Sequence, residues 1–241
     1  MDPDVVVLGG GTAGYSTALR AAQLGKRVAL VERDGRLGGT CLLRGCIPTK
    51  ALLRSAEVMD TVGRSATWGI QAAGSPDIDG IRAFRDTMVD RLVTGLTHLV
   101  AERKIEVIQG LGRLVGGPAV EVDGRTLTAT DVVIATGSRP KSLPHIAEGP
   151  RVMTSDRALA LETIPSSVVV IGAGAIGLEF ASFYRSMGAE VTVVEALQRI
   201  APAEDEDISR QLVRSFKKRG IAAHAGASVT SVEEGDDSVA V

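Results

Sequence analysis

Residues 5–32 read VVVLGGGTAGYSTALRAAQLGKRVALVE, and residues 168–195 read VVVIGAGAIGLEFASFYRSMGAEVTVVE. The second stretch repeats the first without a gap, at an offset of 163 residues. Each copy begins with an apolar, β-branched run, continues through a G-x-G-x-x-G turn and a helical stretch, and ends in a second apolar run closed by a glutamate. This order predicts a strand–helix–strand unit in each copy.

The two glycine-rich turns predict that each unit binds a dinucleotide, as in a Rossmann-like domain. The first glycine permits a tight turn, the second lets a pyrophosphate approach the helix N-terminus, and the third lets the helix pack on the strand. The closing glutamate would accept a hydrogen bond from a ribose 2′-hydroxyl. The candidate residues are Gly9, Gly11, Gly14 and Glu32 in the first copy and Gly172, Gly174, Gly177 and Glu195 in the second.

The second turn is expected to prefer NAD over NADP. Glu195 would repel a ribose 2′-phosphate, although Arg199 lies just beyond it and counts against this preference. The alternative for both copies is a well-packed strand–helix–strand core whose glycines serve only the turns.

Length and composition describe an ordinary globular protein. The chain has 241 residues, of which 44% are hydrophobic, 3% aromatic and 23% charged, and its net charge is −2. This length fits one large α/β unit or two packed smaller ones. The balanced charge and the scarcity of aromatic residues disfavour partners such as nucleic acids and membranes. The acidic start at residues 1–4 differs from a basic secretory signal, so we expect a cytoplasmic protein.

The two cysteines of the chain, Cys41 and Cys46, lie only five positions apart. In a reducing cytoplasm, such a pair favours redox cycling over a structural disulfide. Residues five apart in a regular helix are separated by about 7.5 Å along its axis, so a disulfide requires a break, which Gly45 and Pro48 can supply.

Nearby positive charges predict lowered pKa values for both thiols. The cations are Arg44, Lys50 and Arg54. A pair of buried free cysteines is the alternative. We expect no metal site, because two thiols without neighbouring His or further Cys cannot complete the four ligands of zinc.

Residues 38–53, GGTCLLRGCIPTKALL, resemble the redox-active segment of the pyridine nucleotide–disulfide oxidoreductases. Within that family, the ending CIPTKALL is most similar to dihydrolipoamide dehydrogenases. The first repeat, TDVVIATGSRP at residues 130–140 and the second repeat stand in the family's order, so the resemblance covers essentially the whole chain. Relatives are about twice as long, which implies that this chain corresponds to their N-terminal half.

The resemblance implies a flavoenzyme with FAD on the first repeat and NAD on the second. Cys41 would exchange disulfides with the substrate, and Cys46 would lie against the flavin as a thiolate. Lys50 would lie near the flavin N5, paired with Glu179. The other positions that the resemblance assigns to cofactor binding are Gly39, Thr40, Gly112, Ala135, Thr136 and Gly137 for FAD, and Val229 for the nucleotide adenine.

Between the repeats, apolar positions recur at helical spacing from Asp77 to Lys104, which predicts one long amphipathic helix. The strands expected after it are 105–108, 119–122, 125–128 and 132–135. The dipeptide Asp123-Gly124 favours a hairpin between the second and third of these strands, and therefore a small antiparallel β excursion. The fourth strand would return to the first sheet.

Prolines at 140, 144 and 150 predict a linker between two domains. We expect an α/β protein with an FAD-binding domain at 1–147, lacking its C-terminal return segment, and an incomplete NAD-binding domain at 148–241.

The function implied by the resemblance is the oxidation of dihydrolipoamide by NAD, through FAD and a Cys41–Cys46 disulfide. The expected partner is a lipoyl-bearing protein or a small dithiol, and the full-length form is expected to be a homodimer. Two alternatives remain open. One is a flavoenzyme similar to glutathione or mercuric reductase, and the other is an inactive nucleotide-binding fragment.

Overall fold

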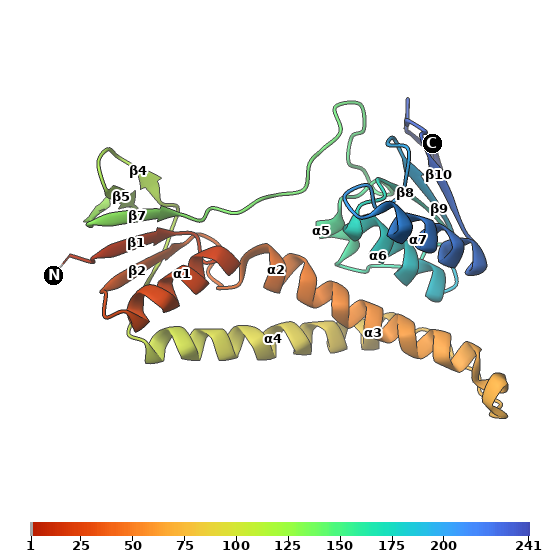
Figure 1. Ribbon diagram of the computed structural model, residues 1–241, viewed down its shortest axis with the longest axis horizontal. Helices are drawn as coiled ribbons and strands as arrows, with labels where there is room; N and C mark the ends of the chain where they lie inside the picture. Colours follow the sequence, from red (N-terminus) through yellow and green to blue (C-terminus); the bar gives the residue numbers. More distant parts are fainter. Residues whose placement is uncertain (1) are drawn as a thin grey trace. The chain divides into compact units, whose positions relative to one another are not determined.

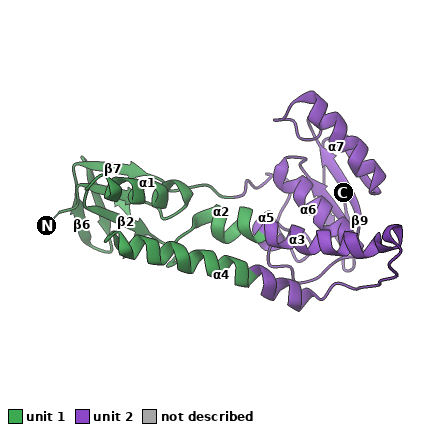
Figure 2. Cartoon of the chain, turned by 60° about the horizontal axis from the view of Figure 1, so that its bottom comes forward, with its two compact units in different colours: residues 1–48, 86–139 green, residues 49–85, 140–241 purple. Residues whose placement is uncertain are grey.

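The structure is a computed structural model that describes residues 2–241 and forms two compact units. The first unit contains residues up to Pro48 together with Asp86–Arg139, and the second contains Thr49–Arg85 together with Pro140–Val241 (Figure 2). Residues 49–85 thus group with the second unit although they precede much of the first in sequence. The domain bounds 1–147 and 148–241 stay a prediction.

A four-stranded parallel sheet forms the centre of the first unit, in the order β3-β2-β1-β7 (Figure 1). Its strands are β1 (Val5–Leu8), β2 (Val28–Glu32), β3 (Glu106–Gln109) and β7 (Asp131–Ile134). Helix α1 (Thr12–Gln23) links β1 to β2, as the first repeat predicts. The expected return of the last strand is confirmed, because Val5 is in register with both Val28 and Asp131.

A small antiparallel sheet completes the first unit, as predicted. It contains β4 (Arg113–Leu114), β5 (Ala119–Val122) and β6 (Arg125–Thr128). Asp123 and Gly124 both have positive φ, at 48° and 81°, which suits the two-residue turn between β5 and β6. Val120 and Leu127 from this sheet are buried with Val6 of β1, so the excursion covers one face of the parallel sheet.

The helical segment after the first repeat is broken at one residue. Helix α2 (Gly39–Arg44) ends at Gly45, whose φ of −153° and ψ of −108° interrupt the helix, and α3 (Cys46–Gly63) begins immediately after it. Pro48 lies in the first turn of α3, where a missing N–H costs no helical hydrogen bond.

A short 3₁₀ helix, η1 (Ser65–Trp68), follows α3 and carries the only tryptophan of the chain, which is 59% exposed. The predicted long helix is confirmed as α4 (Ile78–Glu102). Its buried positions recur at helical spacing. They are Val89, Val93, Leu96 and Val100.

The second unit is built on a three-stranded parallel sheet in the order β10-β9-β8. The strands are β8 (Ser167–Ile171), β9 (Glu190–Glu195) and β10 (Ile221–Ala225), joined through α6 (Ala175–Ser186) and α7 (Glu206–Lys218). Smaller elements are α5 (Ser155–Ala158), β11 (Glu233–Glu234) and β12 (Val239–Ala240). The second repeat therefore forms the strand–helix–strand unit that its sequence predicts.

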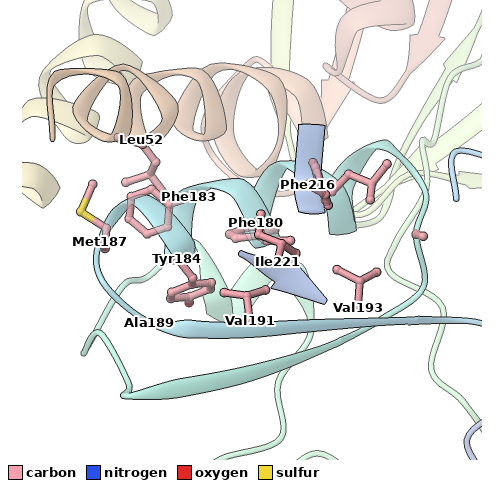
Figure 3. Packing of buried hydrophobic residues seen from close by; sticks show 14 of the residues in the cluster. Leu52, Phe180, Phe183, Tyr184, Met187, Ala189, Val191, Val193, Phe216 and Ile221 are labelled. Carbon is pink, nitrogen blue, oxygen red and sulfur yellow. The ribbon is translucent and has the colours of Figure 1, made fainter. Parts of the chain in front are cut away.

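Aromatic side chains of α6 fill the core of this unit (Figure 3). Phe183 is almost fully buried, and its ring meets that of Tyr184 edge to face with centroids 5.3 Å apart. Leu52 from α3 belongs to the same cluster, together with Val191 and Val193 from β9. Helix α3 beyond Pro48 thus packs on α6 within one unit.

Within residues 2–241, no helix has the combination of length and apolar composition that crossing a membrane requires.

Candidate active site

The first glycine-rich turn joins β1 to α1 at the carboxyl edge of the parallel sheet. Gly9 has a φ of +107°, and a Cβ built there would lie 2.3 Å from the carbonyl oxygen of Ala135. A Cβ on Gly14 would lie 1.7 Å from the carbonyl oxygen of Gly9. Only glycine fits at either position, so α1 and the residue after β7 both approach the turn closely.

The second turn has the same construction. Gly172 has a φ of +98°, and a Cβ on Gly177 would lie 2.1 Å from the carbonyl oxygen of Gly172. The middle glycines differ from these. A Cβ on Gly174 would meet nothing within 4 Å, and one on Gly11 would make only an ordinary contact, 3.5 Å from Gly39 Cα. The backbone at Gly11 and Gly174 is therefore open to close approach by a ligand.

The closing glutamates are held by backbone amides in the same way in both repeats. Glu32 accepts hydrogen bonds from the N–H groups of Gly10, at 2.7 Å, and Asp34, at 2.8 Å. Glu195 accepts from Ala173 at 2.7 Å and Leu197 at 2.8 Å. Each carboxylate oxygen has two lone pairs, so both glutamates keep the capacity to accept a ribose hydroxyl.

The repeat extends beyond the 28 residues that the sequence pattern marks. The N–H of Gly38 donates to the carbonyl oxygen of Gly10 at 2.9 Å, and the N–H of Ala201, 163 residues later, donates to Ala173 at 2.8 Å. Two signals in the sequence could have revealed this extension. Arg36 matches Arg199 at the same offset, and the buried Leu37 matches the buried Ile200.

Two loops of the first unit lie beside the first turn. Gly39 has a φ of +57°, and a Cβ on it would lie 2.5 Å from Gly11 Cα. The hydroxyl of Thr40 donates to the carbonyl oxygen of Ser138 at 3.4 Å, just after the predicted residues 135–137. Ligands of open parallel sheets bind at this carboxyl edge. The structure therefore brings Gly9, Gly11, Gly14, Gly39, Thr40, Ala135, Thr136 and Gly137 to one edge of the first sheet.

A dinucleotide fits these two turns. Helices α1 and α6 begin after Gly11 and Gly174, and neither N-terminus is capped by a side chain or has an acidic residue in its first turn. Helix α7, in contrast, is capped by the carboxylate of Asp205. The first amides of α1 and α6 therefore remain available to a pyrophosphate, beside glycine backbone that admits close approach.

Two predicted cofactor residues have a weaker connection to these turns. A Cβ on Gly112 would lie 2.3 Å from Leu8 Cδ1, so packing of apolar side chains already explains this glycine. Val229 lies half-buried in the loop after β10. Their assignments to FAD and to the adenine stay predictions.

The two cysteines flank the break between α2 and α3 in the first unit. Cys41 is half-buried on α2, Cys46 is the exposed first residue of α3, and both are free thiols. The side chain of Cys46 lies near enough to Cys41 to be the largest influence on the pKa of its thiol. The break at Gly45 makes this possible, because a continuous helix would separate the two residues.

The pKa of the Cys41 thiol is raised, so the predicted lowering is wrong for this cysteine. The main cause is the hydrogen bond with Cys46, followed by burial and by repulsion from the Cys46 charge. A hydrogen bond from the hydroxyl of Thr12, at the start of α1, acts in the opposite direction. The sequence interpretation missed Thr12, because nothing in its spacing connects it to Cys41.

The cations expected to lower the thiol pKa are each paired with a carboxylate. Arg44 binds Asp34 at 3.2 Å, and Arg54 binds Glu57 at 2.6 Å. Lys50 binds Glu179. These pairings direct the positive charges to carboxylates rather than to the sulfur of Cys41.

The raised pKa predicts how alkylation of Cys41 depends on pH. Only the thiolate reacts, so its rate should keep rising with pH beyond the range where an ordinary cysteine reaches its plateau. Trypsin cleavage after Arg36, Arg44 and Lys50 places the two cysteines in separate peptides, 37–44 and 45–50, so mass spectrometry can follow each one. Cys46→Ser should shift the Cys41 profile to lower pH. An unchanged profile would contradict the assigned cause.

The pairing predicted between Lys50 and Glu179 is present in the second unit, with 2.7 Å between Nζ and Oε1. The side chains are 61% and 30% exposed, so the pair contributes at most about 1 kcal/mol to stability. Glu179 lies in the first half of α6, the helix that follows the second glycine-rich turn.

In the described part of the chain, no three His, Cys, Asp or Glu side chains gather as metal ligands.

Comparisons with known proteins show what the whole chain is similar to. A family profile described as pyridine nucleotide-disulphide oxidoreductase matches residues 3–241. Dihydrolipoyl dehydrogenase of Bacillus subtilis is 43% identical over 254 residues, covering 97% of this chain and 53% of that protein. The enzyme of the same name from Zymomonas mobilis is 42% identical over 98% of this chain and 52% of its own length. The chain spans about half the length of the curated relatives it matches.

Solved structures show the same fold. LpdA from Mycobacterium tuberculosis matches with a TM-score of 0.88 and 30% identity, over 98% of this chain and 54% of that one. The HOCl-induced flavoprotein disulfide reductase RclA from Escherichia coli matches with a TM-score of 0.84 and 29% identity, over 98% of this chain and 52% of that one.

Proposed function

Because the chain belongs to the pyridine nucleotide-disulphide oxidoreductases, we propose that it is the FAD- and NAD-binding part of a dihydrolipoamide dehydrogenase. The observation that carries this proposal is the cysteine pair. Cys41 and Cys46 lie together across a helix break, in the unit that also contains the first glycine-rich turn. A thiol pair beside a dinucleotide turn is the arrangement that electron transfer from a dithiol requires.

The two turns have different tasks in this proposal. The first turn, Glu32 and the loops at 39–40 and 135–137 hold FAD, and the second turn with Glu195 holds NAD. Bound FAD would supply two-electron chemistry between thiols and a nicotinamide. Lys50, fixed by Glu179 at 2.7 Å, would place a positive charge that favours a reduced, negatively charged cofactor.

The cysteine steps begin with the Cys41–Cys46 disulfide. A substrate thiolate attacks Cys41 Sγ, forms a mixed disulfide and displaces Cys46 as a thiolate. The second substrate thiol then attacks the substrate sulfur bound to Cys41, closes the substrate disulfide and displaces Cys41. The departing Cys41 sulfur takes up the proton that the attacking thiol loses. Its raised pKa makes it a slower leaving group but a ready proton acceptor. The dithiol is oxidised, and its electron pair stays with the two cysteines.

The remaining parts of the proposal concern the whole protein. The substrate is a lipoyl group on a carrier protein or a small dithiol, the full-length form is a homodimer, and the protein works in the cytoplasm. The sequence similarity to dihydrolipoyl dehydrogenases supports the assignment of the substrate.

The test uses the chain reconstituted with FAD. We expect flavin to remain bound through gel filtration, NADH to bind in preference to NADPH, and lipoamide to oxidise the reduced cysteine pair. Oxidation by glutathione disulfide or mercuric ion, with NADPH preferred, would favour the alternative flavoenzyme. If the chain bound both nucleotides but its cysteines exchanged no disulfide with lipoamide, it would be an inactive nucleotide-binding fragment, and the proposal would be wrong.

A further inference from the structure

The loop after β9 contains a backbone conformation that needs support. Ala201 has a φ of 46°, and it is one of four non-glycine residues with positive φ among residues 2–241. A side chain with a Cβ disfavours this left-handed region. The N–H of Ala201 donates to the carbonyl oxygen of Ala173 at 2.8 Å, within the second glycine-rich turn. The turn therefore rests on a conformation that alanine adopts only when its neighbours enforce it.

Arg199 provides that support. Its guanidinium donates to the carbonyl oxygens of Pro202 and Glu204, both at 3.0 Å, and so closes the loop of residues 199–204 around Ala201. The hydroxyl of Ser209, which is buried on α7, donates to the carbonyl oxygen of Ala201 at 3.3 Å. The loop is thus held on both sides of the strained residue.

The first repeat shows what happens when this strain is absent. Gly38 stands at the position of Ala201 and adopts positive φ, at 129°, as glycine readily does. Arg36, at the position of Arg199, instead binds Asp90 on α4 at 2.6 Å. Where glycine supplies a positive φ, the arginine serves a different contact. Where alanine must adopt it, the arginine holds the loop.

We propose that Arg199 is a positioning residue for the adenosine end of the second nucleotide site. It holds Ala201 against Ala173 and so fixes the turn, and it is not a ligand for a ribose 2′-phosphate. This inference rests on the proposed binding of NAD to the second repeat.

The surrounding charges agree with this role. The carboxylate of Glu195 is buried and fixed by two amides, four residues before Arg199. A 2′-phosphate would meet that carboxylate, while the arginine nitrogen nearest the loop already donates to two carbonyl oxygens. Arg199 therefore does not cancel the discrimination that Glu195 provides.

The test measures binding of ADP-ribose and of 2′-phospho-ADP-ribose to the chain by calorimetry, because both probes need only the adenosine end of the site. Arg199→Met should weaken ADP-ribose binding by about tenfold. Arg199→Lys should weaken it less. Adding Ala201→Gly to Arg199→Met should restore most of the affinity, since glycine adopts the required backbone without support. The phosphorylated probe should remain the weaker ligand of every variant.

Arg36→Met is the matched control, because it removes the same side chain from the equivalent position of the first repeat. It should leave ADP-ribose binding unchanged. Circular dichroism and retained FAD report that each variant is folded.

Two results would overturn the inference. One is an Arg199→Met variant that loses affinity only for the phosphorylated probe, and the other is a loss that Ala201→Gly does not repair. Equal ADP-ribose affinity of the wild type and Arg199→Met would also overturn it, while leaving the NAD site standing. A wild-type chain that binds no ADP-ribose would remove both the NAD assignment and the inference.

Discussion

In the full-length dehydrogenase proposed above, replacing Cys46 by serine should lower oxidation of dihydrolipoamide by about a thousandfold or more, because the pair can no longer form a disulfide. The chain alone can display the same defect. With an aromatic disulfide that releases a coloured thiolate, the reduced wild-type chain should release two equivalents, one on attack by the first cysteine and one on closure by the second. Cys46→Ser should release only one and keep a stable adduct.

The adduct of each single variant lies on its one remaining cysteine. In Cys46→Ser it should lie on peptide 37–44, and in the matched variant Cys41→Ser on peptide 45–50. A wild-type chain that keeps an adduct instead of closing would show that the two thiols do not reach each other, and the cysteine assignment would fall.

Replacing Gly14 by alanine will destabilise the first unit by at least about 3 kcal/mol and abolish FAD retention. The added methyl group would lie 1.7 Å from the Gly9 carbonyl oxygen. Relieving this overlap would require the backbone of the turn or of helix α1 to shift. Unfolding in urea, followed by circular dichroism, measures the loss of stability. Gly177→Ala should act in the same way on the second unit, where the corresponding distance is 2.1 Å.

Gly11→Ala is the matched control for this effect. Gly11 has a φ of −73° and a ψ of −174°, which alanine adopts freely, and its Cβ would make only an ordinary contact. We expect stability within about 0.5 kcal/mol of the wild type, together with weaker FAD binding, because the methyl group lies where a pyrophosphate would approach. If Gly11→Ala and Gly14→Ala destabilised the chain equally, the assignment of a packing role to Gly14 and a binding role to Gly11 would be wrong.

The sequence predicted the elements of this fold well because their signals are local. Strands rich in β-branched residues, the dipeptide Asp123-Gly124 and the spacing along α4 each specify their conformation over a few residues. The break at Gly45 was also predictable, since the Cys41–Cys46 spacing conflicts with a continuous helix.

Charge effects at the cysteines could not be predicted from proximity in sequence. Arg44, Lys50 and Arg54 are near the thiols along the chain, yet each reaches a carboxylate supplied by its own folded surroundings. Glu179 lies 129 residues from Lys50, and only family resemblance indicated that pair. The raised pKa of Cys41 comes from contacts that exist only after α2 and α3 have formed.

Trp68 has a consequence for optical measurements on this chain. Its indole lies on the short helix η1 and is largely exposed to water in the folded state, so its emission maximum is already that of a solvated indole. Unfolding would change that emission little. Tryptophan emission would therefore follow the core poorly. In the flavin-loaded chain, the yellow colour and emission of the bound cofactor would therefore report on the first unit better than intrinsic fluorescence.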